Sequence, residues 1–298
     1  MVALSTVSEL IVVNHTEEQN IPILMYHSIS SYASPRFRPC IVSPEAFEEH
    51  LSYLDQCHCT SVTVTQFVQA IARGGDGLPP RSVVLTFDDG YADFYTDALP
   101  ALQHHGFVAT LYIPTAFVGG TSLWVQDMDE GSRPLLTWEQ LAEISASGIE
   151  CGAHTHTHRP LDMLPLSVVR DEIVRSKELL EEHLGQQVSS FAYPSGFYSA
   201  RVRQIVQAVG YASACAVKGA LSSLHDDPYA LARLAIKPDT GVHDLAAALS
   251  TGHGPLVASH VKRARAHLRQ RARSVYGKLW CGWSGLYKGD EADAVGND

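Results

Sequence analysis

The sequence predicts an α/β fold built on a mainly parallel sheet, with a helical extension at the C-terminus. Three observations predict this fold class. Short apolar or β-branched runs alternate with longer segments of helical periodicity, which is typical of parallel sheets covered by helices. The seven candidate strands favour barrel-like closure over an open, doubly wound sheet. Polar side chains directly follow several of these runs, where parallel α/β proteins bind their ligands.

The candidate strands are runs of five or six residues rich in Val, Ile, Leu, Ala and Tyr. Such short runs between longer periodic segments are typical of buried parallel strands. We expect them at residues 22–26, 82–87, 108–113, 148–153, 189–193, 212–217 and 231–236.

The segments between the strands are predicted helices, and capping residues mark several of their ends. Ser43 before Pro44 is typical of an N-cap and a first helical turn, Thr137 with Gln140 forms a capping-box pattern, and Gly185 stands where a C-terminal glycine is preferred. The helices are expected at residues 44–56, 65–73, 91–104, 137–147, 166–184 and 199–209.

We expect the chain to divide into an N-terminal extension (1–20), a main domain (21–239) and a C-terminal basic amphipathic helix with an acidic tail (240–298). Apolar residues recur every three or four positions between 257 and 279, with arginines between them. Two interpretations stay open. The helix docks on the barrel with a solvated basic face, or residues 256–287 contact an anionic membrane surface.

Composition sets the class of protein. The chain has 298 residues, of which 45% are hydrophobic, enough for a sizeable core. No run of about 18 apolar residues occurs, and the N-terminus lacks the features of a signal peptide. We therefore expect a cytoplasmic protein, with peripheral contact at the inner membrane as the alternative. The six cysteines are irregularly spaced and form no structural zinc pattern, so we expect mostly reduced cysteines with structural roles.

The net charge of −10 is unevenly distributed along the chain. Basic residues concentrate between 261 and 288, a stretch without Asp or Glu, so the preceding body is strongly acidic. Sequence-independent binding to phosphates requires a basic surface. The sequence therefore argues against nucleic acid as a partner, and it does not define an oligomeric state.

Two adjacent carboxylates, Asp88 and Asp89, end the apolar run at 82–87. Adjacent acids repel each other, and a divalent cation would offset that repulsion. The alternative is a turn in which Asp caps a helix that begins near Tyr91. The histidines at 154, 156 and 158 decide between these, because His154 and His158 on a turn can reach one ion together with an Asp. His156 would then point elsewhere, whereas on a strand all three histidines would share one face.

Three motifs resemble the signatures of the polysaccharide deacetylases, the NodB-homology or carbohydrate esterase 4 family. They are TFDDG (86–90), HTHTH (154–158) and FAYPSG (191–196). The resemblance runs from about Ile21 to Asp239. LMYH (24–27) and LARL (231–234) resemble the circularly permuted exopolysaccharide-type branch. This resemblance implies a distorted, incomplete (β/α) barrel of seven strands.

The resemblance also implies a metal-dependent hydrolase that removes N-acetyl groups from N-acetylhexosamine units of a polysaccharide or glycoconjugate. Asp88 would be the catalytic base and His27 the general acid. Asp89, His154 and His158 would hold a divalent metal, usually Zn²⁺ and sometimes Co²⁺ or Ni²⁺. The alternative for His27 is a buried histidine without a chemical role.

The third motif supplies the predicted substrate-binding and oxyanion group. The resemblance implies that the backbone N–H of the residue after the motif proline stabilises the oxyanion. The residues concerned are Tyr193, Pro194, Ser195 and Gly196.

The sequence departs from the family pattern at two positions. Family members commonly have Arg where this chain has Ala192, which removes a support for Asp88, and Arg233 either replaces it or forms a surface salt bridge. Family members often have an aromatic residue where Ser195 stands. Trp124, in an insertion after the third predicted strand, either offers a stacking surface for sugar or packs within its loop.

Three alternatives to this function remain at the sequence level. The two departures favour a catalytically weak glycan-binding or scaffold protein of the same fold. A deacetylase of a small amide fits the same motifs. Two histidines and a carboxylate also bind Fe(II) in oxygenases, but a second acid beside the ligand favours hydrolysis.

Overall fold

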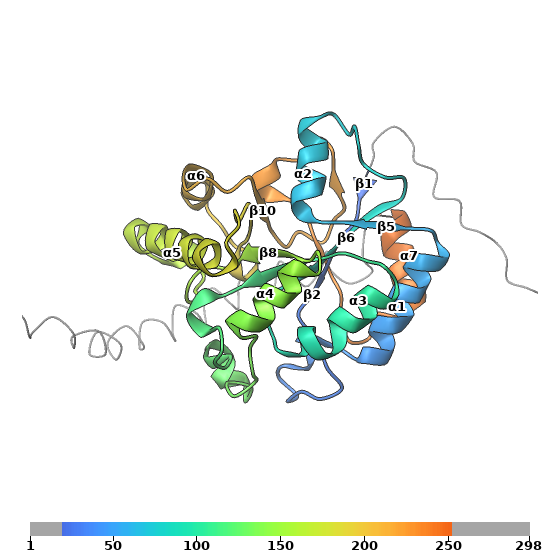
Figure 1. The fold of residues 1–298 in the computed structure, drawn as a ribbon, viewed down its shortest axis with the longest axis horizontal. Coiled ribbons are helices and arrows are strands. Elements are labelled where there is room, and N and C mark those ends of the chain that lie inside the picture. The colour runs from blue at the N-terminus through green and yellow to red at the C-terminus, as the bar shows by residue number, and fades with distance from the viewer. Residues whose placement is uncertain (1–19, 252–298) are drawn as a thin grey trace, which may run out of the picture. The chain divides into compact units, whose positions relative to one another are not determined.

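An eight-stranded parallel sheet forms the centre of the computed structural model, which describes residues 20–251 (Figure 1). The strand order is β10-β9-β8-β7-β6-β2-β12, and β5 pairs with β6 beside this path. All seven strands of the path are predicted from the sequence, but β5 is not, because it is short and its first residue is exposed. The bounds are β2 (Ile23–Tyr26), β5 (Thr60–Val62), β6 (Ser82–Phe87), β7 (Thr110–Ile113), β8 (Glu150–Ala153), β9 (Ser190–Ala192), β10 (Ser213–Cys215) and β12 (Leu234–Ala235).

The two ends of the sheet approach each other around Leu231. Its backbone forms a parallel bridge with Cys215 of β10. Leu234, three residues further along, pairs with Leu24 of β2 at the other end of the path. The sheet therefore curls into the distorted barrel that the sequence predicts. This closure leaves Arg233 between strands that are far apart in the sequence.

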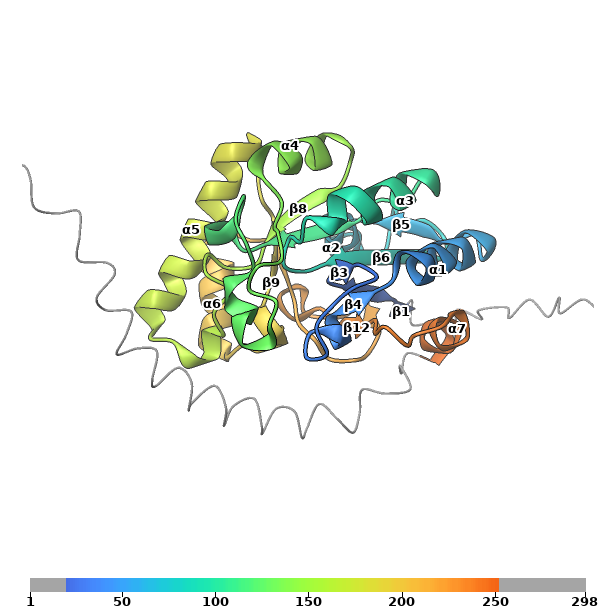
Figure 2. The same cartoon turned by 90° about the horizontal axis from the view of Figure 1, so that it is seen from below.

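Seven α-helices cover the sheet in the described part of the chain. Helices α5 and α6 lie at one end of the sheet, and α1 and α7 lie at the other (Figures 1 and 2). The predicted caps are present: the Ser43 hydroxyl accepts from the Ala46 N–H, Thr137 and Gln140 form a capping box, and Gly185 ends its helix at a φ of 64°. The bounds are α1 (Pro44–Gln56), α2 (Val64–Ala72), α3 (Leu99–His104), α4 (Trp138–Ala146), α5 (Leu166–Leu184), α6 (Ala200–Ala208) and α7 (Val242–Thr251).

The helix predicted over residues 91–104 is wrong in its first half. Residues 94–98 form a π-helical turn, η2 (Phe94–Ala98), and only the following residues form α3. Pro100 lies in the first turn of α3, and because proline has no N–H it cannot continue the hydrogen-bond ladder of a helix that starts earlier.

Short elements complete the described chain. Two pairs of two-residue strands flank the barrel, one antiparallel (β1 with β11) and one parallel (β3 with β4). The bounds are β1 (Asn20–Ile21), β3 (Ser28–Ile29), β4 (Ile41–Val42), β11 (Ser222–Ser223), η1 (Arg38–Cys40), η3 (Thr115–Phe117), η4 (Leu123–Met128), η5 (Leu161–Met163), η6 (Pro194–Gly196) and η7 (Pro228–Ala230).

Helix α7 packs into the main core through Leu245 and Ala248. The predicted basic helix beyond it, its membrane contact and the N-terminal extension fall in residues 1–19 and 252–298, outside the described residues, so the domain boundaries stay predictions. In the described range no helix has the length and hydrophobicity to span a membrane, and the five cysteines there are free thiols.

An aromatic cluster fills the core behind the end of β6. Phe87 stacks on Tyr26 at 5.3 Å between ring centroids and meets Phe47 and Phe94 edge to face at 5.7 and 4.9 Å. All four side chains are buried. This packing supports the strand end that carries the two aspartates.

Phe87→Ala is expected to lower the free energy of unfolding by about 3–5 kcal/mol, because it removes a buried ring and leaves a cavity. Urea denaturation followed by circular dichroism measures the loss. Tyr32→Ala is the matched control, since Tyr32 is 78% exposed and a surface change costs within about 0.5 kcal/mol. Equal losses in both variants would contradict the packing argument.

Candidate metal and active site

The predicted site residues follow the carboxyl ends of neighbouring parallel strands. His27 follows β2, Asp88 and Asp89 follow β6, and His154 follows β8. The paired strands β2, β6, β7 and β8 are consecutive in the sheet. Parallel strands bring these polar residues to one edge of the sheet, where ligands of α/β proteins bind.

The backbone at this edge adopts left-handed conformations at four residues that are not glycine. The φ angles are 80° at Asp89, 67° at Thr155, 55° at His158 and 56° at Ser195. Each such residue costs of order 1–3 kcal/mol and persists only where the surrounding structure enforces it. Their concentration in the three motifs indicates that the fold holds these side chains in fixed positions for a function.

Asp89, His154 and His158 form a cluster suited to a metal ion. Their ligand atoms all lie within 4.8 Å of one another. Nε2 of His158 is 3.0 Å from Oδ1 of Asp89, and Nε2 of His154 is 3.5 Å from the same oxygen. Nδ1 of His154 hydrogen-bonds the Ala192 carbonyl oxygen at 2.8 Å. This bond places the proton on Nδ1 and leaves the Nε2 lone pair directed toward Asp89.

The unsatisfied carboxylate oxygen of Asp89 also indicates that these three side chains suit a divalent cation. Oδ1 of Asp89 is buried and has no hydrogen-bond partner, although a histidine nitrogen lies 3.0 Å away. A buried carboxylate oxygen without a partner is costly, and buried polar atoms are normally satisfied. Two imidazoles and one carboxylate are also the ligands of open zinc sites. A cation between these atoms would satisfy the unpaired oxygen.

The electrostatic environment favours the metal-binding forms of His154 and Asp89. Burial lowers the pKa of His154 to about 4, so its imidazole is neutral at pH 7. Burial alone would raise the pKa of Asp89, but the neighbouring histidines, His158 foremost, more than offset it, and the pKa lies below its usual value. Metal binding requires neutral histidine and ionised carboxylate, which are the forms of His154 and Asp89.

Asp88 is held by a buried guanidinium. Nη1 and Nη2 of Arg233 donate to the two carboxylate oxygens of Asp88 at 2.6 and 2.8 Å. Arg233 is fully buried and also donates to the Ala216 carbonyl and the Thr86 hydroxyl. The contact expected from the sequence is therefore present, and it is buried. A surface salt bridge, the alternative, is wrong.

Arg233 also sets the charge state of Asp88. Burial would raise the pKa of Asp88, but the Arg233 guanidinium and His154 lower it, and the net shift is downward. Asp88 is therefore a carboxylate at neutral pH. His27 is half-buried at the same edge, and its charge contributes to lowering the pKa of both aspartates.

The third motif forms a tight loop, η6, beside the cluster. Ser195 is exposed, whereas Pro194 and Gly196 are buried. Gly196 has a φ of 72°, and a Cβ there would lie 2.6 Å from the backbone nitrogen of Val217. Only glycine fits this position, so the close approach of Val217 fixes the conformation of the loop.

Tyr193 differs from the prediction that it lines the substrate site. Its ring is fully buried and stacks on Tyr198 at 4.4 Å, and its hydroxyl donates to the Tyr229 carbonyl at 3.0 Å. A tyrosine ring is apolar and its hydroxyl needs a partner when buried, and both requirements are met inside the protein. Tyr193 therefore supports the loop and presents no surface to a sugar.

Trp124, in η4 of the insertion, packs against His158. Its ring lies 4.8 Å from His158 and 4.9 Å from Phe117 between centroids. Its indole nitrogen is buried without a hydrogen-bond partner. Loop packing is present, and the half-buried ring forms one wall beside His158.

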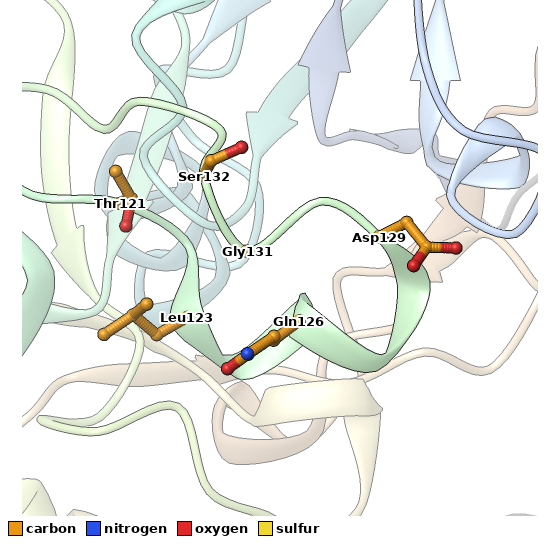
Figure 3. A pocket seen from close by; sticks show the side chains of 6 residues that line it. All are labelled: Thr121, Leu123, Gln126, Asp129, Gly131 and Ser132. Carbon is orange, nitrogen blue, oxygen red and sulfur yellow. The ribbon is translucent and has the colours of Figure 1, made fainter.

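A hollow of about 410 Å³ lies on this insertion (Figure 3). None of the predicted site residues lines it. Its walls are formed by Thr121, Leu123, Gln126, Asp129, Gly131 and Ser132.

His156 lies away from Asp89. Its Nδ1 hydrogen-bonds the Thr115 hydroxyl at 2.9 Å, and its N–H donates to the Glu172 carbonyl at 3.1 Å. The strand that precedes it ends at Ala153, so the alternation that would align three histidines on one face is broken. The histidines therefore lie on a turn, which brings His154 and His158 together and leaves His156 apart from them.

Two residues near the site are not predicted as site residues from the sequence. Tyr91 is buried with an unpaired hydroxyl, and its pKa is raised by burial and then by the charge of Asp89. Its position directly after the DDG sequence was the available signal. The Glu172 carboxylate, on α5, accepts hydrogen bonds from the N–H and the hydroxyl of Thr157 and fixes the histidine turn. No local sequence signal identifies Glu172.

The sequence is similar to those of known proteins. The family model described as "Polysaccharide deacetylase" matches residues 75–214. The "Putative polysaccharide deacetylase YxkH" of Bacillus subtilis is 32% identical over 219 residues, which cover 73% of this chain and 72% of that protein. The poly-beta-1,6-N-acetyl-D-glucosamine N-deacetylase of Escherichia coli is 32% identical over 137 residues, which cover 44% of this chain and 20% of that protein.

Solved structures agree with these matches. The Streptococcus pyogenes deacetylase PplD, in complex with acetate, has a TM-score of 0.68 at 27% identity, covering 78% of this chain and 99% of that one. IcaB from Ammonifex degensii has a TM-score of 0.68 at 26% identity, covering 78% of this chain and 97% of that one. With its three motifs at the carboxyl ends of strands of this barrel, the chain belongs to the polysaccharide deacetylase family, a family of hydrolases that act on carbon–nitrogen bonds.

Proposed function

We propose that this protein is a metal-dependent N-deacetylase that hydrolyses the acetamide of N-acetylhexosamine units in a polysaccharide or glycoconjugate. The observation that carries the proposal is the buried pair of Asp88 and Arg233 beside the cluster of Asp89, His154 and His158. The poly-N-acetylglucosamine deacetylases among its relatives support the same class of substrate.

Asp89, His154 and His158 would hold the cation, with Zn²⁺ as the preferred ion and Co²⁺ or Ni²⁺ as alternatives. A bound divalent cation lowers the pKa of the attacking water and polarises the acetamide carbonyl. The Ala192 carbonyl orients His154 through Nδ1. Such outer hydrogen bonds fix the ring of a ligating histidine.

Asp88 would accept the proton of the attacking water. The two Arg233 hydrogen bonds fix the carboxylate and keep it ionised. The lowered pKa makes Asp88 a weak base, which is sufficient because the attacking water is itself acidified. Ser195 would donate its backbone N–H to the developing oxyanion. His27 would then protonate the leaving amine of the sugar.

The rival function is a catalytically weak glycan-binding protein, suggested by Ala192 and Ser195. Arg233, which directly precedes β12, weakens that case. Its guanidinium supports Asp88 in place of the arginine that family members commonly have at the position of Ala192. Deacetylation of a small amide remains a second candidate.

Acetate release separates these functions. The chelator-treated protein is assayed on N-acetylglucosamine oligomers and on small acetamides, with Zn²⁺, Co²⁺, Ni²⁺ or no metal added. We expect release from oligomers that returns only with metal. Activity confined to small amides would support the second candidate. If no acetate is released with any metal, the deacetylase proposal fails and glycan binding is the function that remains.

His158→Ala is expected to lose metal, whereas His156→Ala keeps it. His158 lies 3.0 Å from the unpaired Asp89 oxygen, whereas His156 is bonded to Thr115. Removing one of three ligands leaves too few donors for a stable zinc site. Metal per chain is measured after dialysis against a fixed free Zn²⁺ concentration. Circular dichroism shows whether each variant is folded. Metal loss in the His156 variant as well would restore the interpretation of three equivalent histidines.

A further inference from the structure

A second group of metal-ligating side chains lies outside the catalytic cluster. Within residues 20–251, Glu48, His104 and His105 are the other set whose ligand atoms all lie within 4.8 Å of one another. Glu48 belongs to α1, His104 ends α3, and His105 follows it. The two helices pack against each other on the outside of the barrel and lie side by side in Figures 1 and 2.

The donors are partly fixed in place. Nε2 of His105 lies 2.7 Å from Oε1 of Glu48, and the His105 ring stacks on Phe107 at 6.0 Å between centroids. The His105 side chain is 8% exposed, so its position is set by the protein. His104 is exposed and Glu48 is 46% exposed, which leaves the cluster open to an ion from solvent.

The two histidine rings converge although their residues are adjacent. Adjacent helical side chains usually diverge, but here the rings of His104 and His105 meet edge to face at 5.1 Å between centroids. Helix α3 ends at this point, and the negative end of a helix dipole favours positive charge. This location adds a favourable field for a cation.

We propose that Glu48, His104 and His105 form a second metal site, selective for a borderline cation such as Zn²⁺. Two imidazoles and a carboxylate suit zinc, with water in the fourth position. Tetrahedral bonds of about 2.0–2.1 Å place donors about 3.4 Å apart. The exposed side chains of Glu48 and His104 can close this gap by rotation.

This site is structural and separate from catalysis. His104 and His105 lie just before β7, at the amino edge of the sheet, whereas Asp88 follows the carboxyl end of β6. A bound ion would tie α1 to α3. Because it binds only the folded arrangement, it stabilises the fold by mass action.

Counting bound zinc tests the proposal. Protein without a histidine tag is dialysed against buffered free Zn²⁺, and metal per chain is measured. We expect two ions in the wild type and one in His104→Ala. His104 is exposed, so this change leaves the fold intact. His225→Ala, at another exposed histidine, is the matched control and keeps two.

A second pair of variants separates this site from the catalytic one. His154→Ala is expected to bind one ion, and His104→Ala/His154→Ala none. If His104→Ala and the wild type bind the same number of ions, the second site does not exist. If His104→Ala loses an ion and His154→Ala does not, the second site stands and the proposed catalytic metal fails.

A thermal shift gives an independent readout. In His154→Ala, Zn²⁺ is expected to raise the melting temperature, and the added Glu48→Gln change should remove that rise because an amide is a poor zinc ligand. A rise that survives both Glu48→Gln and His104→Ala would overturn the proposal.

Discussion

Asp88→Asn is expected to lower kcat/KM for acetate release by about 10²–10⁴-fold, the range typical for loss of a general base. The amide has nearly the same shape as the carboxylate but cannot accept the proton of the attacking water. The ligand atoms of Asp89, His154 and His158 are unchanged by this substitution, so the variant should retain its metal. Initial rates on an N-acetylglucosamine oligomer and metal per chain are measured on the same sample.

The fold of Asp88→Asn needs its own measurement, because Arg233 loses a carboxylate partner inside the protein. Circular dichroism at the assay temperature shows whether the variant remains folded. His156→Ala is the matched control for a change near the site that leaves the proposed chemistry intact. A folded, metal-loaded Asp88→Asn protein with activity within tenfold of the wild type would remove Asp88 from the role of base.

The strands and most helices are predictable because their signals are local. The all-buried run of β6 and the capping residues Ser43 and Thr137 determine their elements within a few neighbouring positions. Because parallel strands end at one edge, the residues following β6 and β8 are expected from the sequence to meet. The cluster of Asp89, His154 and His158 is therefore the most predictable part of the site.

The remaining features depend on contacts between distant segments. Whether Arg233 reaches Asp88 depends on how the sheet closes at Leu231, which no local pattern encodes. Burial of the Tyr193 hydroxyl depends on the carbonyl of Tyr229, 36 residues later in the chain. The sequence shows that an aromatic residue belongs to a motif, but it does not determine whether the fold buries its ring or leaves it facing the substrate.

Arg233→Met is expected to lower the free energy of unfolding by about 3–5 kcal/mol, because it leaves the buried Asp88 carboxylate without its counter-charge. Methionine fills much of the same volume, so the loss reports charge and hydrogen bonding more than a cavity. Urea denaturation measures it. Burial then acts on Asp88 without the guanidinium, so the pKa of Asp88 rises. Any residual activity should increase with pH over a range where the wild type is already ionised.

The double variant Asp88→Asn/Arg233→Met separates charge pairing from packing. Each single change leaves one buried polar partner unsatisfied, whereas the double change removes both charges together. We therefore expect the double variant to lose less stability than the two single losses combined, with a coupling of about 0.5–3 kcal/mol. Additive losses would mean that Asp88 and Arg233 are held by their surroundings independently. In that case the guanidinium could not be the support that replaces the missing arginine at Ala192.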